Sequence, residues 1–239
     1  MLYEYQPDRR KERPRVFLDG FSGYLHTDGY AGYHALPGNI RIVGCFAHAR
    51  RKFDDALKLL PEKERANCLA QRGLQYIKRL YAIEEEIAAL SIEERYTQRQ
   101  ERARPVLEAF LAWLKTLNVG KSVLGRAVKY TQDQWAYLIR YLEDGSLEID
   151  NNRAERSIKP FVIGRKNFLF ANAPDGAKGS AVIYTMIQTA MENGLNPYTY
   201  LAYVFKNAPN WDLVNDPEKL ELLMPWRTLK ACENGVDPS

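Results

Sequence analysis

A long, almost entirely helical pattern, from about residue 54 to residue 142, constrains this chain more than any other feature. Apolar residues recur at helical spacing in L-Q-Y-I-K-R-L-Y, at Leu74, Ile77 and Leu80, which is typical of helices with one buried face. Pro105 suits the first turn of a further helix. The stretch therefore predicts a large, all-helical body.

Two groups of side chains in this helical stretch could lie either in the core or on the surface. Trp113 and Trp135 suit a packed core better than a surface that stacks on DNA bases, because large aromatic rings contribute most when they are buried. The acidic run Glu84–Glu86 is expected on a solvated helix face.

Short alternating elements precede the helical stretch and predict an α/β arrangement. The expected strands are Leu2–Tyr5, Tyr24–Thr27 and Ile40–Phe46, and the expected helices are Val16–Phe21, one turn at Tyr30–Ala35, and Ala47–Leu60. A strand that starts at the second residue needs something to pair with, which predicts that the chain begins inside a larger domain.

The segment Gly145–Phe170 combines one carboxylate with a dense basic cluster. After a turn at Asp150, a short helical segment carries Glu155, and a basic, aromatic, strand-like run follows. The cations around this acid are Arg153, Arg156, Lys159, Arg165 and Lys166. Asn152 and Glu155 also fit a capping box at a helix start, which explains the acid but not the cations. A metal-binding acid among phosphate-binding bases explains both, and the two interpretations stay open.

The remainder of the chain predicts a loop at Pro174–Gly179, helices at Ser180–Asn193 and Pro197–Asn207, and a peripheral tail. The expected domains are the first part of a core (residues 1–53), the helical insertion (54–145), the second part of the core with the Glu-bearing helix (146–207) and the tail (208–239).

Asp28 is a second acid with the placement of a functional residue. It follows the expected strand Tyr24–Thr27 and precedes Gly29, and acids at strand ends beside a glycine are common in α/β active sites. An ordinary Asp-Gly turn explains it equally well. With Glu155 it forms a pair that can hold Mg²⁺, with Mn²⁺ as a substitute, and two such ions support phosphoryl transfer. The basic cluster then follows a DNA backbone.

Composition narrows the possible partners and the cellular compartment of the chain. The net charge of +4 permits a nucleic-acid partner without requiring one. The three cysteines, Cys45, Cys68 and Cys232, are scattered and odd in number, which favours a reducing cytoplasm over a disulfide framework. The sequence contains no run of about 18 apolar residues, so no membrane span is predicted. The N-terminus lacks the apolar centre of a signal peptide.

Two short motifs suggest weaker alternatives. Cys45 and His48 form a C-x-x-H pair, but no second Cys/His pair follows to complete a zinc site. His48 and Arg51 form the H-x-x-R fragment of tyrosine recombinases, which also need separated arginines and one positioned tyrosine. The main alternative to an enzyme is a non-catalytic DNA-binding or assembly protein that uses only the basic surface.

Four longer motifs resemble the insertion-sequence-66 family of bacterial transposases. They are T-D-G-Y-A-G-Y (27–33), C-F-A-H-A-R-R-K-F (45–53), D-N-N-R-A-E-R-S-I-K-P-F-V-I-G-R-K-N-F-L-F (150–170) and D-G-A-K-G-S-A-V-I-Y-T-M-I-Q-T-A-M-E-N-G-L-N-P-Y-T-Y-L (175–201). The resemblance covers nearly the whole chain.

The resemblance implies an RNase H-like core with an Asp-Asp-Glu triad, a helical insertion before the Glu, and Mg²⁺-dependent cleavage and transfer of DNA strands at transposon ends and target. It makes Asp28 the second acid and Glu155 the third. Its DNA contacts are Arg153, Arg156, Lys159, Arg165, Lys166 and Asn167.

The family's first acid lies in an Asp-Glu-Thr segment that nothing here matches. Asp8 and Asp19 occupy turn and helix contexts. The chain is therefore expected to be a C-terminal portion that is weak or inactive alone, and that associates with itself or with a complementing upstream fragment.

Overall fold

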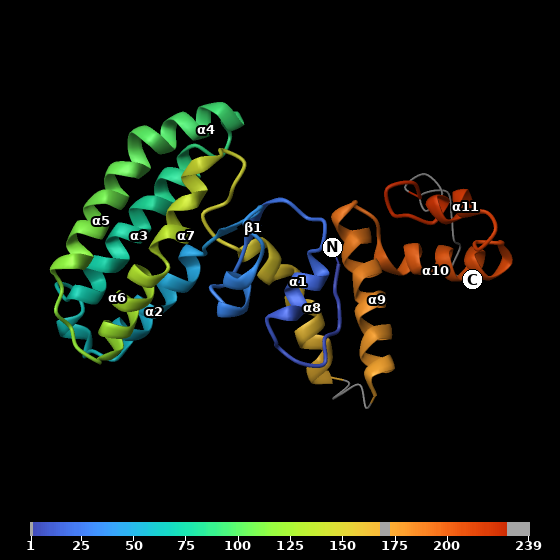
Figure 1. Ribbon diagram of the computed structural model, residues 1–239, viewed down its shortest axis with the longest axis horizontal. Coiled ribbons are helices and arrows are strands. Elements are labelled where there is room, and N and C mark those ends of the chain that lie inside the picture. The colour runs from blue at the N-terminus through green and yellow to red at the C-terminus, as the bar shows by residue number, and fades with distance from the viewer. Residues whose placement is uncertain (1, 168–172, 229–239) are drawn as a thin grey trace. The chain divides into compact units, whose positions relative to one another are not determined.

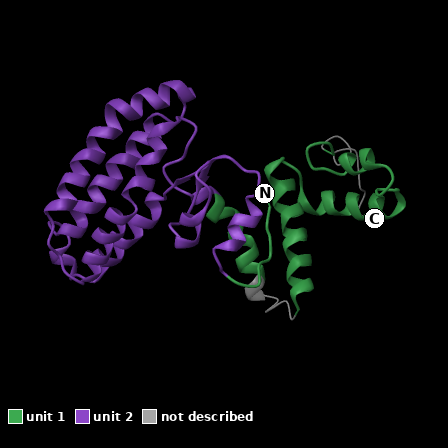
Figure 2. Ribbon diagram, in the orientation of Figure 1, with its two compact units in different colours: residues 1–8, 154–239 green, residues 9–153 purple. Residues whose placement is uncertain are grey.

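Helices dominate the computed structural model, which describes residues 2–167 and 173–228. The chain divides into two compact units: unit 2 comprises residues 9–153, and unit 1 comprises residues 1–8 with residues 154–239 (Figures 1 and 2). Among the described residues, no helix is both long enough and apolar enough to cross a membrane.

Unit 2 contains a two-stranded parallel sheet of β1 (Gly23–His26) and β2 (Ile40–Val43). Gly23 pairs with Ile40, and His26 pairs with Val43. These strands confirm the two expected at Tyr24–Thr27 and Ile40–Phe46. The turn η1 (Ala31–Ala35) connects them, also as expected. Because the strands are parallel, the residues that follow each of them emerge at the same edge of the sheet.

A helical bundle fills most of unit 2 (Figure 1). Its helices and short turns are α2 (Phe46–Lys58), η2 (Glu62–Glu64), α3 (Leu69–Glu86), α4 (Ile92–Gln98), η3 (Arg99–Ala103), α5 (Arg104–Thr116), α6 (Val123–Asp133), α7 (Trp135–Leu138) and η4 (Ile139–Glu143). α2 packs against both α3 and α6, and α3 packs against α5. The short helix α1 (Glu12–Phe17) precedes the sheet in place of the helix expected at Val16–Phe21.

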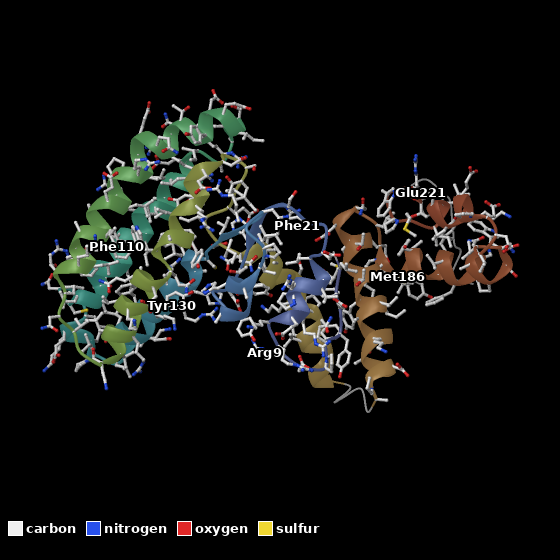
Figure 3. All side chains as sticks on the ribbon, viewed as in Figure 1. Arg9, Phe21, Phe110, Tyr130, Met186 and Glu221 are labelled. Atoms are coloured by element: carbon white, nitrogen blue, oxygen red, sulfur yellow. The ribbon has the colours of Figure 1, made fainter. Side chains whose placement is uncertain are left out.

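The bundle core is aromatic. Phe53 and Phe110 have no exposed surface, and Trp113 is buried. The Phe110 ring, labelled in Figure 3, lies 5.0 Å from that of Tyr76 and 6.0 Å from that of Trp113. Trp135 meets Phe110 edge-on at 5.8 Å. The assignment of both tryptophans to the core is confirmed.

A buried ion pair closes one end of the bundle. Arg99 is in η3, a π-helical turn, and its guanidinium meets the Glu84 carboxylate at 2.6 Å. The same guanidinium donates to the carbonyls of Tyr141 and Leu147 at 3.0 and 2.8 Å. The expectation that Glu84 is solvated is wrong, because its side chain is only 15% exposed. Arg99 thereby links helix α3 to residues 141–147, the segment through which the chain leaves the bundle.

Unit 1 is helical. Its elements are α8 (Asn152–Asn167, which starts in unit 2), α9 (Pro174–Glu192), α10 (Pro197–Asn207), η5 (Ala208–Asn210) and α11 (Pro217–Leu222). Leu195, Tyr200 and Val204 form a small core where α9 and α10 meet. The helix expected at Pro197–Asn207 is confirmed, whereas the loop expected at Pro174–Gly179 is wrong, because α9 starts at Pro174.

Two expected strands are absent from the described part of unit 1. Leu2–Tyr5 forms no regular element, because Tyr3 pairs with helices instead: its N–H donates to Thr185 Oγ1 at 2.9 Å, and its ring stacks on Phe161 at 5.8 Å. The run after Glu155 is helical to Asn167 despite Pro160 within it. The expectation of a basic, aromatic, strand-like run is wrong as far as Asn167, and the end of that run at Phe170 lies outside the described residues.

Candidate functional site

Asp28 lies two residues beyond β1, at the edge where both strands end. Its side chain is exposed, and its Oδ1 accepts the N–H of Tyr30 at 3.0 Å. Within the described residues, Oδ2 accepts no hydrogen bond. Gly29 follows with φ of +82°, a conformation that favours glycine. The turn thus fixes one carboxylate oxygen and leaves the other available.

Helix α6 packs against this turn. The Tyr130 hydroxyl lies 3.4 Å from the Asp28 carbonyl, and a Cβ added at Gly29 would lie 3.0 Å from that hydroxyl. Burial, with the charge of Asp28, raises the pKa of Tyr130 to about 12, so its hydroxyl stays a hydrogen-bond donor at neutral pH. Lys52 of α2 lies 4.7 Å above the Tyr130 ring. A cation therefore lies on the same part of the surface as Asp28.

The end of β2 is tied to the start of α8. Cys45 follows β2, is buried, and accepts the N–H of Asn151 on its sulfur at 3.3 Å. The N–H of Phe46 also donates to the carbonyl of Ile149 at 3.2 Å. Burial raises the pKa of the Cys45 thiol, which favours a neutral thiol over the thiolate that a metal site requires. Cys45 acts here as a structural acceptor.

Asp150 is a buried carboxylate whose oxygens are committed to neighbouring donors. Its Oδ2 accepts the hydroxyl of Tyr81 at 2.7 Å and the side-chain amide of Asn152 at 2.6 Å, and its Oδ1 accepts the N–H of Asn152 at 2.9 Å. Burial, followed by the bond to Asp150, raises the pKa of Tyr81. Asp150 therefore organises the start of α8 rather than facing a ligand.

Glu155 lies in the first turn of α8. The capping-box interpretation places Asn152 before the helix, but α8 begins at Asn152 and Asp150 supplies the acceptor at its start. That interpretation is therefore wrong in its residues. Asp28 belongs to unit 2 and Glu155 to unit 1, so their sharing of one metal ion is part of the proposal below.

The predicted DNA contacts fall on α8. Arg153, Arg156 and Lys159 are exposed and recur every three residues, which places them on one side of a helix. Arg165, Lys166 and Asn167 are helical as well, but their side chains lie outside the described part.

Sequence reasoning assigned no supporting role to four residues that shape this edge: Lys52, Tyr81, Tyr130 and Asp150. Of these, Asp150 was predicted only as a turn residue. Lys52 could have been identified from the sequence. It lies one helical turn after His48 on the helix that follows β2, so the two side chains share one side of that helix. Tyr81 and Tyr130 come from the helical stretch, where spacing indicates burial and gives no sign of which hydroxyl reaches the sheet.

Comparison with known proteins identifies two family models along the chain. The model described as "Transposase IS66 family" matches residues 1–179, and the one described as "IS66 C-terminal element" matches residues 185–226. The first covers Asp28 and Glu155. No solved structure matches the chain.

Three similar proteins come from Sinorhizobium fredii (strain NBRC 101917 / NGR234). "Uncharacterized protein y4jD" is 35% identical over 94% of this chain and 45% of its own length. "Uncharacterized protein y4hP" is 32% identical over 98% and 45%, and "Uncharacterized protein y4qI" is 32% identical over 95% and 43%. The chain thus spans slightly less than half the length of these curated relatives.

Proposed function

The chain belongs to the IS66 transposase family, and from that premise we propose that it carries metal-binding residues for the cleavage and joining of DNA strands. Asp28 and Glu155 are the proposed metal ligands. Mg²⁺ is the proposed ion, and Mn²⁺ can replace it. The observation that carries the proposal is the position of Asp28, an exposed carboxylate at the shared end of two parallel strands.

Asp28 suits a hard divalent cation. Mg²⁺ prefers a few carboxylate oxygens and keeps water or phosphate oxygens in its remaining positions. The Tyr30 N–H orients one oxygen of Asp28, so an ion can bind the other without a large rearrangement. Glu155 is the proposed second ligand because α8 starts from the same sheet edge, where Asn151 is anchored to Cys45.

We extend the proposal to the fold: β1, β2, α2 and α8 belong to an RNase H-like core, and α3 to α7 form a helical insertion within it. Strand β2 leads directly into α2, and the helical body returns to the same edge through Asp150. On this proposal the insertion does not separate Asp28 from Glu155 in function, although it separates them in sequence.

The proposed chemistry is phosphoryl transfer. A bound divalent ion supplies charge stabilisation at the oxygens that attack and leave. The chain's own contribution is position and charge: Arg153, Arg156 and Lys159 hold backbone phosphates through contacts that carry no sequence information. The proposed partners are the DNA of transposon ends and target, and a second copy or fragment that completes the assembly.

A thermal-unfolding titration with Mn²⁺ tests the metal site. We expect the wild type to gain melting temperature with rising Mn²⁺, because a ligand that binds only the folded state stabilises it. Asp28→Asn and Glu155→Gln should lose that gain, whereas Glu148→Gln, an exposed acid near the same edge, should retain it. An equal gain in all four proteins contradicts the proposal.

A non-catalytic DNA-binding or assembly function is the second candidate, favoured by the exposed basic row on α8. DNA binding that falls steeply with salt, and that Mn²⁺, Asp28→Asn and Glu155→Gln all leave unchanged, supports this candidate over the first.

A further inference from the structure

A basic and aromatic surface adjoins Asp28 within unit 2. Helix α1 lies against η1, and η1 follows directly after Asp28 and Tyr30. We call the side chains of this region the α1–η1 surface: the exposed Arg9, Lys11, Arg15, Phe17 and His34, with the half-buried Tyr33. Figure 3 labels Arg9 at the start of this segment.

The cations come from α1 and the residues before it. Residues 9–15 contain five cationic side chains and one acid, Glu12. Arg9, Lys11 and Arg15 are exposed, and α1 contributes no buried residue. A helix that has no fully buried residue and concentrates positive charge gains little from the core of its own unit. Its composition suits binding to a polyanion.

The aromatic rings come from α1 and η1. Phe17 is 46% exposed. Tyr33 meets Tyr30 edge-on at 5.8 Å, and the exposed His34 stacks on Tyr137 at 4.8 Å. Arg9 lies 5.1 Å above the Tyr30 ring, whose hydroxyl donates to the Arg9 carbonyl. These contacts fix η1 to the basic segment and leave ring surface accessible to a ligand.

Interleaved cations and rings distinguish unpaired DNA from a duplex. The cations can bind either form of DNA, because both carry phosphates. Exposed rings favour an unpaired strand, because its bases have free faces for stacking. Each stacked base contributes roughly 1–3 kcal/mol to binding. Inside a duplex those faces are already stacked.

We propose that the α1–η1 surface binds an unpaired DNA strand beside Asp28. This inference rests on DNA being the substrate of the proposed function and specifies its form: a strand end, or a locally opened duplex, is held by Phe17 and His34 while Lys11 and Arg15 contact its phosphates. It assigns DNA binding to a second surface, distinct from the basic row on α8.

Fluorescence anisotropy with labelled DNA tests the inference in the full chain. The probes are a 20-nucleotide oligothymidylate and a 20-base-pair duplex, both in EDTA so that no metal site contributes. We expect Phe17→Leu and His34→Leu each to weaken binding of the oligothymidylate by roughly fivefold or more, with duplex binding within about twofold of wild type. In Phe17→Leu, leucine retains apolar bulk and removes only the ring. In His34→Leu, it also removes the two ring nitrogens, so Phe17→Leu is the cleaner test of stacking.

Matched variants separate stacking from charge and from folding. Tyr96→Leu removes an exposed ring from α4 and should leave both affinities unchanged. Lys11→Ala with Arg15→Ala should weaken both probes and lower the salt dependence by roughly one counterion per cation removed. Circular dichroism confirms folding, and both single variants lie at exposed positions.

Unchanged oligothymidylate affinity in Phe17→Leu and His34→Leu overturns the inference, as does the absence of oligothymidylate binding by the wild type. Loss of self-association in these variants, without loss of oligothymidylate affinity, also overturns it and makes the surface a protein contact. The outcome is independent of the metal proposal, because EDTA removes divalent ions from every sample.

Discussion

The hydroxyl of Tyr81, in the C-terminal part of α3, donates to the buried carboxylate of Asp150 at 2.7 Å. This bond joins the helical bundle to the residue that starts α8. On the proposed function, α8 carries the metal-binding Glu155, so the insertion positions part of the site. Tyr81 and Asp150 act through Glu155 and are positioning residues rather than ligands.

Tyr81→Phe is therefore expected to weaken Mn²⁺ binding by roughly threefold to tenfold, somewhat less than the loss typical when a residue bonded directly to a ligand is removed. It should also lower the free energy of unfolding by about 1.5–3 kcal/mol, because the bond is made to a charged group. Isothermal titration calorimetry measures the first effect and urea unfolding the second.

Tyr76→Phe is the matched control on the same helix. Its ring packs on Phe110, and its hydroxyl makes no hydrogen bond within the described residues. It should leave Mn²⁺ affinity unchanged. If Tyr81→Phe loses stability and keeps full Mn²⁺ affinity, the bond has a structural role only.

Arg99 provides a test of the bundle itself. Arg99→Leu leaves Glu84 buried without its cation, and breaking such a pair costs about 3–5 kcal/mol of unfolding free energy. Arg102→Leu breaks the more exposed pair with Glu86 and should cost no more than about 1 kcal/mol. Urea unfolding of both variants measures the difference. Equal costs would mean that burial of the Arg99 pair has no energetic consequence.

Two glycines in helices are expected to respond in opposite directions to alanine. A Cβ at Gly73 would lie 2.5 Å from Phe53 Cε1, so Gly73→Ala should destabilise unit 2 by about 1–3 kcal/mol through overpacking. Gly179 in α9 has nothing within 4 Å of its added Cβ, so Gly179→Ala should stabilise by about 1 kcal/mol through helix propensity. Chemical denaturation followed by circular dichroism checks both signs.

His26 predicts a pH dependence of stability. Burial lowers the pKa of this imidazole, against the opposing charges of Glu148 and Asp150. The unfolded chain then binds the proton more readily, so stability is complete above the ordinary histidine pKa of about 6.5 and falls as pH decreases below it. Melting temperatures between pH 7.5 and 5 should fall less in His26→Gln than in wild type. Parallel curves would show that His26 is not responsible.

The sequence predicted regular elements where local pattern and tertiary contacts agree. Strands β1 and β2, helix α2 and the core positions of Trp113 and Trp135 follow directly from periodicity and residue type. The segment after Glu155 did not follow, because its branched residues favour a strand while Asp150 starts a helix. The strand predicted at Leu2–Tyr5 was wrong for a related reason. Tyr3 contacts the side chain of Thr185 and the ring of Phe161, and no local pattern reveals these partners.

The candidate site was only partly accessible to sequence reasoning. Asp28 was predicted as a metal ligand because a strand end and a glycine mark it, and Glu155 because cations surround it. The residues that support them, Tyr130 and Tyr81, come from the bundle more than 50 residues from their partners. Such long-range hydrogen bonds depend on how helices pack, and helical spacing alone does not encode them.

Electron paramagnetic resonance titration of Mn²⁺ across a double-mutant cycle of Asp28→Asn and Glu155→Gln tests the central claim most directly. If the two carboxylates hold one ion, each single variant should lose at least roughly tenfold in affinity, and the double variant should lose little more than either alone, because interacting residues are not additive. Wild-type affinity in either single variant, or losses that add fully in the double variant, would contradict the account.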